Sequence, residues 1–380
     1  MASIVDADSH LFEMPEMWSE YADPGDRHHA LYFDRDDNGW DWVSWKDRRI
    51  LETWITRAGD FSTLGPVVER CRVGEQCDFD YRSDLPDHYW NGAARAGALS
   101  DLGADESILF PNWGLNWGLG LRDQPEARLV NEQSWNRWAV QVKADGGESL
   151  HPVGHLELED LDWLERQLQM LAAGGIKIGW IPAGLVNGVR LSDERFDRAW
   201  AMFEHYDINP VFHVGANPNR PFADGWYTND HSEWLSMMAI PLIGLDVFAS
   251  LVDLVLGGVM ERFSTLRWGV LEVMTDWFPM LLRRLDVASY TQLAATGRTT
   301  IDLAETPSHY IHRSVRVSSF ATEQPGETMD AVGPLLMWSA DYPHAEGEPH
   351  LDVYRNRAGH ISDGDADAFW GGNAEFLLGR

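Results

Sequence analysis

The chain has 380 residues, 44% of them hydrophobic, and a mean hydropathy of -0.32. Because no apolar run approaches the roughly 18 residues of a membrane-spanning helix, the sequence predicts a soluble globular protein. Sixty acidic against 30 basic residues give a net charge of -30, which opposes binding to nucleic acid and to anionic membrane surfaces. We therefore expect a small-molecule substrate as partner, and neither a nucleic acid nor a membrane.

The N-terminal sequence MASIVDADSH lacks the basic and apolar regions of an export signal, so we expect a cytoplasmic protein. The two cysteines, Cys71 and Cys77, have no histidine or third cysteine beside them. This pattern predicts reduced thiols rather than a structural zinc site or a disulfide framework.

Short apolar segments rich in β-forming residues recur along the whole chain and alternate with amphipathic, helix-like stretches. The predicted strands are residues 3–8, 106–111, 150–158, 175–182, 209–215, 266–273, 314–320 and 335–343. Strands that alternate with helices predict an α/β fold with a parallel sheet. Eight of them favour a distorted (β/α)8 TIM barrel in a single domain, residues 1–380. An open, doubly wound sheet is the alternative, but no GxGxxG motif follows the first strand.

Two connections are too long for simple turns: about residues 11–85 after the first strand, and about 215–240 after the fifth. Long loops that follow barrel strands tend to carry lids and binding residues. We therefore predict an inserted loop or subdomain with Trp18 and Trp54 as substrate-binding residues, and a substrate loop in which Arg220 meets a carboxylate. Packing within the insertion is the alternative for the tryptophans, and a solvated loop for Arg220.

Polar residues stand at the ends of three predicted strands. Asp8 and His10 are separated by one residue, so their side chains are expected on one side of the strand, with Asp6 as a deeper structural residue on the same side. His213 and Asp341 end two further apolar strands, where a carboxylate is costly to bury without a cation. In a barrel these ends meet at one rim, so the set predicts one divalent metal ion, zinc first, with manganese or iron as alternatives. Unrelated polar residues at strand ends are the other interpretation.

The stretches DADSHLFEMPEMW, FHVG, LEVMTDWFPMLLRRLD and WSADYPHAEG, in this order and spacing, resemble the amidohydrolase superfamily. The resemblance is to the amidohydrolase 2 branch, which is related to aminocarboxymuconate-semialdehyde decarboxylase. It implies a metal-dependent barrel in which Asp8, His10 and His213 are ligands and Asp341 binds the metal or receives the proton of its water. It also implies that His344 supports the ligands or binds substrate, unless it is a plain loop histidine, and that the protein is a homodimer.

The sixth predicted strand departs from the pattern of this branch. Decarboxylases of the branch usually carry an acid/base histidine there, whereas this chain has LEVMTDW with Glu272. Glu272 can act as an acid/base if burial raises its pKa, and His231 in the fifth loop is another replacement acid. The resemblance also bears on the number of metal ions, because binuclear relatives use histidines at the fifth and sixth strand ends and a carbamylated lysine on the fourth strand. Here the sixth-strand histidine is missing, and Lys177 is expected near the start of the fourth strand. We therefore expect one metal ion.

These residues predict a metal-dependent hydrolase that acts on a small carbonyl-bearing substrate, aromatic or cyclic, through a metal-activated water, with Asp341 taking the proton. The alternative is a nonoxidative decarboxylase, a carbon-carbon lyase, that acts on a hydroxybenzoate-like or unsaturated keto acid. A third interpretation is a noncatalytic barrel that binds a ligand through its aromatic loops and holds no stoichiometric metal.

Overall fold

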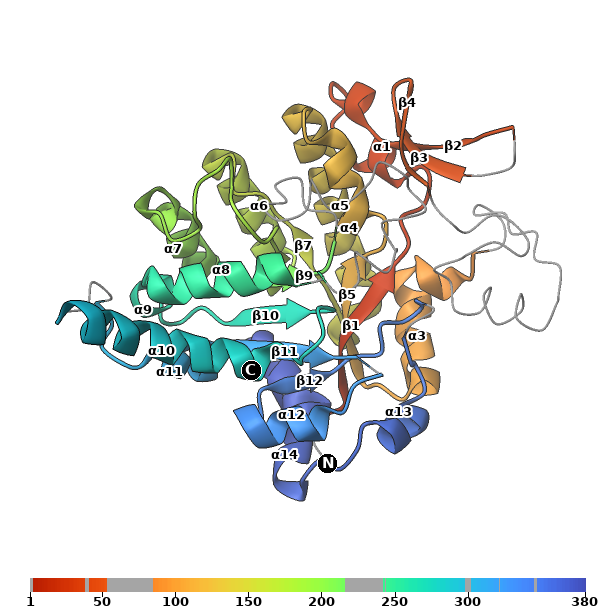
Figure 1. The fold of residues 1–380 in the computed structure, drawn as a ribbon. Helices are drawn as coiled ribbons and strands as arrows, with labels where there is room; N and C mark the ends of the chain where they lie inside the picture. Colours follow the sequence, from red (N-terminus) through yellow and green to blue (C-terminus); the bar gives the residue numbers. More distant parts are fainter. Residues whose placement is uncertain are drawn as a thin grey trace.

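The computed structural model describes residues 3–37, 41–52, 85–215, 242, 244–297, 302–320, 322–344 and 347–380. Eight parallel barrel strands run through the centre of the molecule, and helices α6, α7, α8 and α10 lie outside them (Figure 1). The strands are β1 (Val5–Leu11), β5 (Glu106–Pro111), β6 (Leu150–Pro152) continued as β7 (Gly154–His155), β8 (Ile178–Trp180), β9 (Asn209–His213), β10 (Trp268–Leu271), β11 (Val315–Ser319) and β12 (Leu336–Trp338). Each overlaps a segment predicted from the sequence, and the (β/α)8 barrel is confirmed.

The barrel closes on itself through hydrogen bonds between its first and last strands. The strands pair in the orders β1-β5-β6 and β7-β8-β9-β10-β11-β12, with only Val153 between β6 and β7. At the seam, the Asp341 N–H donates to the Asp8 carbonyl at 2.8 Å, and the His10 N–H donates to the Tyr342 carbonyl at 2.7 Å. Closure brings the carboxyl ends of all eight strands to one rim, as the sequence predicts.

Helices of very different length lie between and after the strands. The helices of eight or more residues are α3 (Gly92–Leu102), α5 (Pro125–Gly146), α6 (Leu161–Ala173), α7 (Asp197–Tyr206), α8 (Leu245–Leu256), α10 (Phe278–Thr296), α11 (Pro307–Ser314) and α12 (Pro325–Val332). The shorter ones are α1 (Met17–Tyr21), α4 (Gly114–Trp117), α9 (Val259–Arg262), α13 (Leu351–Arg357), α14 (Asp363–Asp367) and α15 (Asn373–Leu377). Single 3-10 turns are η1 (Arg27–His29), η2 (Asp87–Tyr89), η3 (Gly118–Leu121), η4 (Gly147–Ser149) and η5 (Glu194–Phe196), and η8 (Ala368–Gly372) is a π-helix.

Apolar side chains from seven of the eight strands fill the interior of the barrel. This interior cluster contains Val5, Ala7, Ile108, Phe110, Val153, Ile178, Trp180, Val211, Leu271 and Met337. Helix α15 covers the amino-terminal end of the strands and adds Ala374 and Leu377 to the same cluster. Full burial of one such aliphatic side chain stabilises the fold by about 1.5–3 kcal/mol, so a packed interior holds the strand ends in fixed positions.

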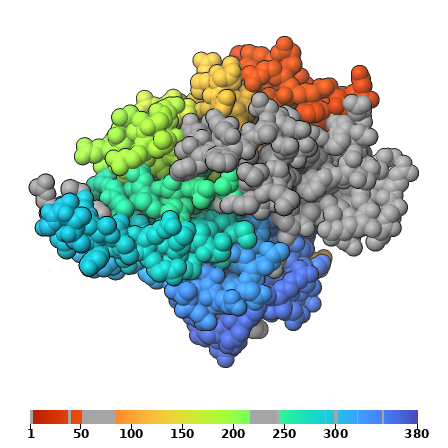
Figure 2. All heavy atoms as spheres, viewed as in Figure 1, coloured from red at the N-terminus to blue at the C-terminus, as the bar shows by residue number. Residues whose placement is uncertain are grey.

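The described part of the chain after β1 packs against α5 and shares a core cluster with it. It contains α1, η1 and an antiparallel sheet of β2 (Tyr32–Arg35), β3 (Asp41–Trp45) and β4 (Arg48–Glu52). Figure 2 shows these residues, in red, beside the gold residues of α5, where Arg137 donates to the Tyr21 carbonyl at 2.7 Å. Trp18 is 1% exposed and stacks on Phe33, so its described contacts are packing contacts.

A β-bulge in β1 decides which of its side chains face the barrel mouth. Asp6 pairs with Ser107 and Ser9 with Leu109, so Ala7 and Asp8 together oppose one residue of β5. Ala7 belongs to the interior cluster, and the extra residue also turns Asp8 inward. Asp6 lies on the outer face instead, where it accepts a 2.5 Å hydrogen bond from Ser9 Oγ. The expectation that Asp6 and Asp8 share a face is therefore wrong, because simple alternation fails at a bulge.

Candidate metal centre

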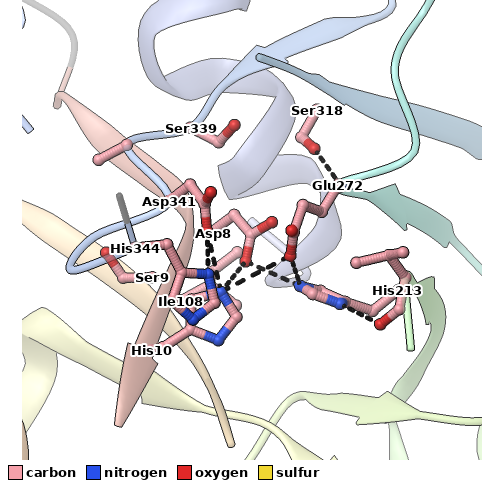
Figure 3. A network of polar contacts seen from close by, with 12 residues as sticks. Asp8, Ser9, His10, Ile108, His213, Glu272, Ser318, Ser339, Asp341 and His344 are labelled. Atoms are coloured by element: carbon pink, nitrogen blue, oxygen red, sulfur yellow. Dashed lines mark hydrogen bonds and ion pairs between the residues drawn. The ribbon is translucent and has the colours of Figure 1, made fainter. Parts of the chain in front are cut away.

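Six buried or nearly buried acidic and histidine side chains meet at the carboxyl ends of four strands (Figure 3). They are Asp8 and His10 from β1, His213 from β9, Glu272 directly after β10, and Asp341 and His344 after β12. Two overlapping groups have a geometry that could hold a metal ion: Asp8, His10, His213 and Glu272, and His10, Glu272, Asp341 and His344. In each group one ligand atom per residue lies within 4.8 Å of all the others.

The distances between these atoms describe one shared centre. His213 Nε2 lies 3.1 Å from Asp8 Oδ1 and 3.3 Å from Glu272 Oε2. His10 Nε2 lies 3.1 Å from Asp341 Oδ1 and 3.6 Å from Asp8 Oδ1. The four residues predicted as ligands are thus brought together, and Glu272, which was predicted as an acid/base, lies at the same centre.

Backbone carbonyls set the orientation of both central imidazoles. His10 Nδ1 lies 3.3 Å from the Pro111 carbonyl, and His213 Nδ1 lies 2.8 Å from the Val214 carbonyl. A carbonyl only accepts, so these contacts assign the proton of each neutral ring to Nδ1 and leave the Nε2 lone pair facing the centre. This is the tautomer that a metal ligand needs.

Burial and mutual repulsion shape the charge of the centre. Burial lowers the pKa of His10 to about 3, so its ring is neutral at neutral pH. Burial, and then the charge of Asp341, raise the pKa values of Asp8 and Glu272 well above their usual range. Burial also disfavours the Asp341 carboxylate, but the charge of the neighbouring His344 outweighs it and holds the pKa of Asp341 below its usual range.

The donor set fits a divalent cation. Asp8 Oδ2, Glu272 Oε2 and Asp341 Oδ2 are buried and have no hydrogen-bond partner among the described residues. Such an unsatisfied buried atom costs about 1–3 kcal/mol, and a cation would supply the missing partner. The sequence predicted two carboxylates and two imidazoles as ligands, whereas the structure brings together three carboxylates and two imidazoles. The larger share of oxygen donors makes this a harder ligand set, which suits manganese better than zinc.

The backbone is strained at two of the acidic residues. Glu272 has φ 54° and Asp341 has φ 53°, in the left-handed region that non-glycine residues seldom adopt. Such a residue costs on the order of 1–3 kcal/mol, and strain of this kind concentrates at functional sites. The Glu272 N–H donates to Ser318 Oγ at 3.0 Å, so the neighbouring strand β11 holds the strained residue in place.

His344 contacts both the acidic and the imidazole part of the centre. Its Nδ1 lies 2.8 Å from Asp341 Oδ1, and its Nε2 lies 2.8 Å from Asn112 Oδ1. Its ring stacks on the ring of His10, with centroids 3.9 Å apart. His344 is therefore placed against the centre rather than in a free loop.

The other residues named from the sequence lie elsewhere. Trp54, Arg220 and His231 fall outside the described residues. Lys177 forms an ion pair with Asp207 just before β8, at the opposite end of the barrel from the centre, where it was expected. No helix of the described residues is long and apolar enough to cross a membrane.

The sequence matches no model of a known protein family and no curated protein. Solved structures do match over the whole chain. An amidohydrolase from Mycobacterium avium subsp. paratuberculosis K-10 has a TM-score of 0.79 at 18% identity, covering 99% of each chain. A 5-carboxyvanillate decarboxylase from Sphingomonas paucimobilis has a TM-score of 0.66 at 16% identity, covering 100% of this chain and 99% of that one.

A dihydroxybenzoic acid decarboxylase from Polaromonas sp. JS666, solved with manganese and the inhibitor 2-nitroresorcinol, has a TM-score of 0.62 at 14% identity. The match covers 100% of this chain and 97% of that chain. At these identities the comparisons establish the fold, a barrel of the kind found in amidohydrolases and related decarboxylases. The resemblance seen in the sequence is thus confirmed at the level of the fold.

Proposed function

We propose that this protein is a metal-dependent enzyme of the amidohydrolase superfamily that removes carbon dioxide, without oxidation, from a hydroxylated aromatic carboxylic acid. The observation that carries the proposal is the convergence of three carboxylates and two neutral imidazoles on one buried centre, beside the histidine His344. Two of the three structures described above are named as decarboxylases, of 5-carboxyvanillate and of dihydroxybenzoic acid, which favours this reaction over the hydrolysis predicted first.

Asp8, His10, His213, Glu272 and Asp341 would hold the metal, and their carboxylate-rich composition supports manganese rather than zinc. A bound divalent ion supplies a Lewis acid for the carboxylate and neighbouring oxygen of the substrate. In this assignment Glu272 is a ligand, and its predicted role as the acid passes to another residue.

Replacement of carbon dioxide by hydrogen needs a proton donor near the ring carbon. The carbon-carbon bond breaks, carbon dioxide leaves, and the electron pair left on the ring carbon takes a proton. His344 Nε2 lies 2.8 Å from Asn112 Oδ1 and its Nδ1 lies 2.8 Å from Asp341 Oδ1, so both ring nitrogens face acceptor oxygens and a protonated His344 would give that proton. The Asp341 carboxylate stabilises the charged form, and the stack on His10 holds the ring in place.

The proposal is tested on enzyme reconstituted with Mn²⁺ and incubated with 2,6-dihydroxybenzoate, 5-carboxyvanillate and a set of aromatic amides and lactones. We expect release of carbon dioxide, deuterium at the vacated ring carbon in D₂O, and loss of both with a chelator. Cleavage of an amide or lactone without carbon dioxide would establish the hydrolase instead. Absence of stoichiometric metal binding would overturn both enzymes and support a noncatalytic barrel.

A further inference from the structure

Arg95 of α3 is a buried cation next to the metal centre. The residue is 0% exposed. Its Nη2 donates to the carbonyl of His10, its Nε donates to the His88 carbonyl at 2.7 Å, and its guanidinium lies 5.1 Å from the ring centroid of Tyr342. Three segments, β1, η2 and the chain after β12, thus meet around one charged side chain.

Arg95 forms no ion pair with an acidic side chain of the described residues. Among the described residues no carboxylate lies within ion-pair distance of its guanidinium, and Nη1 is buried without a hydrogen-bond partner. An arginine remains protonated at neutral pH, and an unpaired buried charge costs several kcal/mol. If Arg95 only filled space, a leucine or a methionine would stabilise the fold more. The buried positive charge therefore has another role.

The contacts of Arg95 fall on the seam that aligns the two ligand-bearing strands. The His10 carbonyl belongs to a central imidazole residue, and Tyr342 directly follows Asp341. The His10 N–H donates to the Tyr342 carbonyl across the seam at 2.7 Å. A shift of the guanidinium would therefore move His10 and Asp341 relative to one another.

The site also gathers acidic groups that favour a nearby positive charge. Asp8, Glu272 and Asp341 are three carboxyl groups of the centre, and Asp6 is a fourth, buried near the start of β1. Arg95 is a fixed cation on the outer side of β1, and it interacts with Asp6 through charge. Asp6 in turn acts by charge on Asp8 of the centre, so Arg95 offsets part of the negative charge on the outer side of β1.

We propose that Arg95 is a positioning residue for the metal centre, which sets the spacing of His10 and Asp341 and so controls the affinity and geometry of the bound ion. The inference rests on the metal centre of the proposed function and is independent of the reaction catalysed there. It assigns to Arg95 no contact with metal or substrate.

The test compares Arg95→Gln and Arg95→Lys with the control Arg316→Gln. Arg316 makes the same kinds of contact at the other end of the barrel. It donates to the His312 and Val315 carbonyls at 3.2 and 2.8 Å and lies 4.1 Å from the Phe376 ring. Electron paramagnetic resonance of Mn²⁺ measures the free ion, hence Kd, in solution, and the symmetry of the bound ion in frozen samples.

We expect Arg95→Gln to raise the Kd for Mn²⁺ about 10- to 100-fold, the range found when residues that orient metal ligands are replaced, and to change the frozen-solution spectrum. Arg95→Lys keeps the charge but loses one carbonyl contact, so we expect a smaller rise, and Arg316→Gln should match the unchanged protein. If circular dichroism shows that Arg95→Gln is not folded, the Kd and the spectrum of Arg95→Lys test the proposal instead. Wild-type Kd and spectrum in a folded Arg95 variant would overturn the proposal, whereas Mn²⁺ binding without decarboxylation would overturn only the proposed function.

Discussion

His344 and Asp341 form a buried pair at the centre, with Nδ1 and Oδ1 2.8 Å apart and the imidazole stacked on His10. The ring of His344 is thus held from three sides, by Asp341, Asn112 and His10. We expect His344→Gln to lower kcat about 10²- to 10⁴-fold, the usual contribution of a positioned acid, with a much smaller effect on Mn²⁺ affinity. His350→Gln, at an exposed position of the same segment, is the control. Undiminished turnover by His344→Gln would remove the histidine from the mechanism.

The acidic composition of the centre determines its metal preference. Replacing Glu272 by Gln removes one hard ligand, and we expect the Kd for Mn²⁺ to rise at least about tenfold, as even ligand-orienting residues have effects of that size. Glu272→His adds an imidazole instead, so the zinc-to-manganese ratio should rise. Elemental analysis after dialysis against equal concentrations of the two ions measures this ratio. An unchanged ratio in Glu272→His would show that Glu272 is not a ligand.

The backbone at Glu272 is strained, so we expect this residue to favour metal binding at the expense of the stability of the fold. Asparagine tolerates the left-handed conformation, and Glu272→Asn also removes a buried carboxyl oxygen without a hydrogen-bond partner. We expect the free energy of unfolding of the metal-free protein to increase by about 1–2 kcal/mol, with weaker metal binding. Urea titration in the presence of a chelator checks this, with Glu327→Asn on the exposed side of α12 as the control. A destabilised metal-free variant would contradict the explanation.

Metal binding should stabilise the folded protein by mass action. A ligand at 100 times its Kd adds about 2.7 kcal/mol to the free energy of unfolding, so Mn²⁺ should raise the Tm and a chelator should reverse the rise. Asp8→Asn should reduce the shift, because Asp8 lies between His10 and His213. Calorimetry across a series of Mn²⁺ concentrations measures the effect. A Tm independent of Mn²⁺ in the unaltered protein would exclude the site.

A separate acid-sensitive contact lies at the amino-terminal end of the barrel. Burial disfavours the Glu106 carboxylate, but His151 and Arg380, each with a nitrogen 2.6 Å from Oε2, outweigh it and lower the pKa of Glu106 to about 2. The Glu106 carboxylate therefore binds a proton less tightly in the folded protein than in the unfolded chain, where its pKa is near 4.5. The stability due to Glu106 is fully present above pH 4.5 and is lost as the pH falls toward 2.

We therefore expect Glu106→Gln to be less stable than the unaltered protein at pH 6, with a difference that shrinks between pH 4.5 and 3. Chemical denaturation at a series of pH values measures both proteins under the same conditions. A difference that is constant across this range would show that the ion pair contributes nothing to stability.

The positions of the strands and of four centre residues could be predicted because apolar runs ended by polar residues are local patterns. Asp8, His10, His213 and Asp341 all stand at such ends, and the closed barrel brings them together. The same signal was present in LRWGVLEV, which ends near Glu272, but the missing histidine directed attention to an acid/base role. Treating every charged residue at the end of an apolar strand as a ligand candidate would have included it.

Other features depend on contacts that no local pattern encodes. The outer position of Asp6 follows from the bulge opposite β5, a register shift visible only once two strands are paired. Trp18 was assigned to substrate from its residue type, whereas its described contacts are with the sheet of the insertion. Arg95 stood in an ordinary helical segment, and nothing in its neighbours in the sequence indicates that it reaches the strand seam.

The bulge in β1 makes the centre depend on the number of residues in a strand as well as on their types. Deleting Asp8 would remove the extra residue, so that Ala7 alone opposes one residue of β5 and the pairing of Ser9 with Leu109 is kept. His10 would then keep its place at the mouth, and the centre would lose the carboxylate of Asp8 alone. One extra residue in a strand thus adds a carboxylate to the barrel mouth while the side chains beyond it keep their faces, which makes gain or loss of this ligand a short evolutionary step for the scaffold.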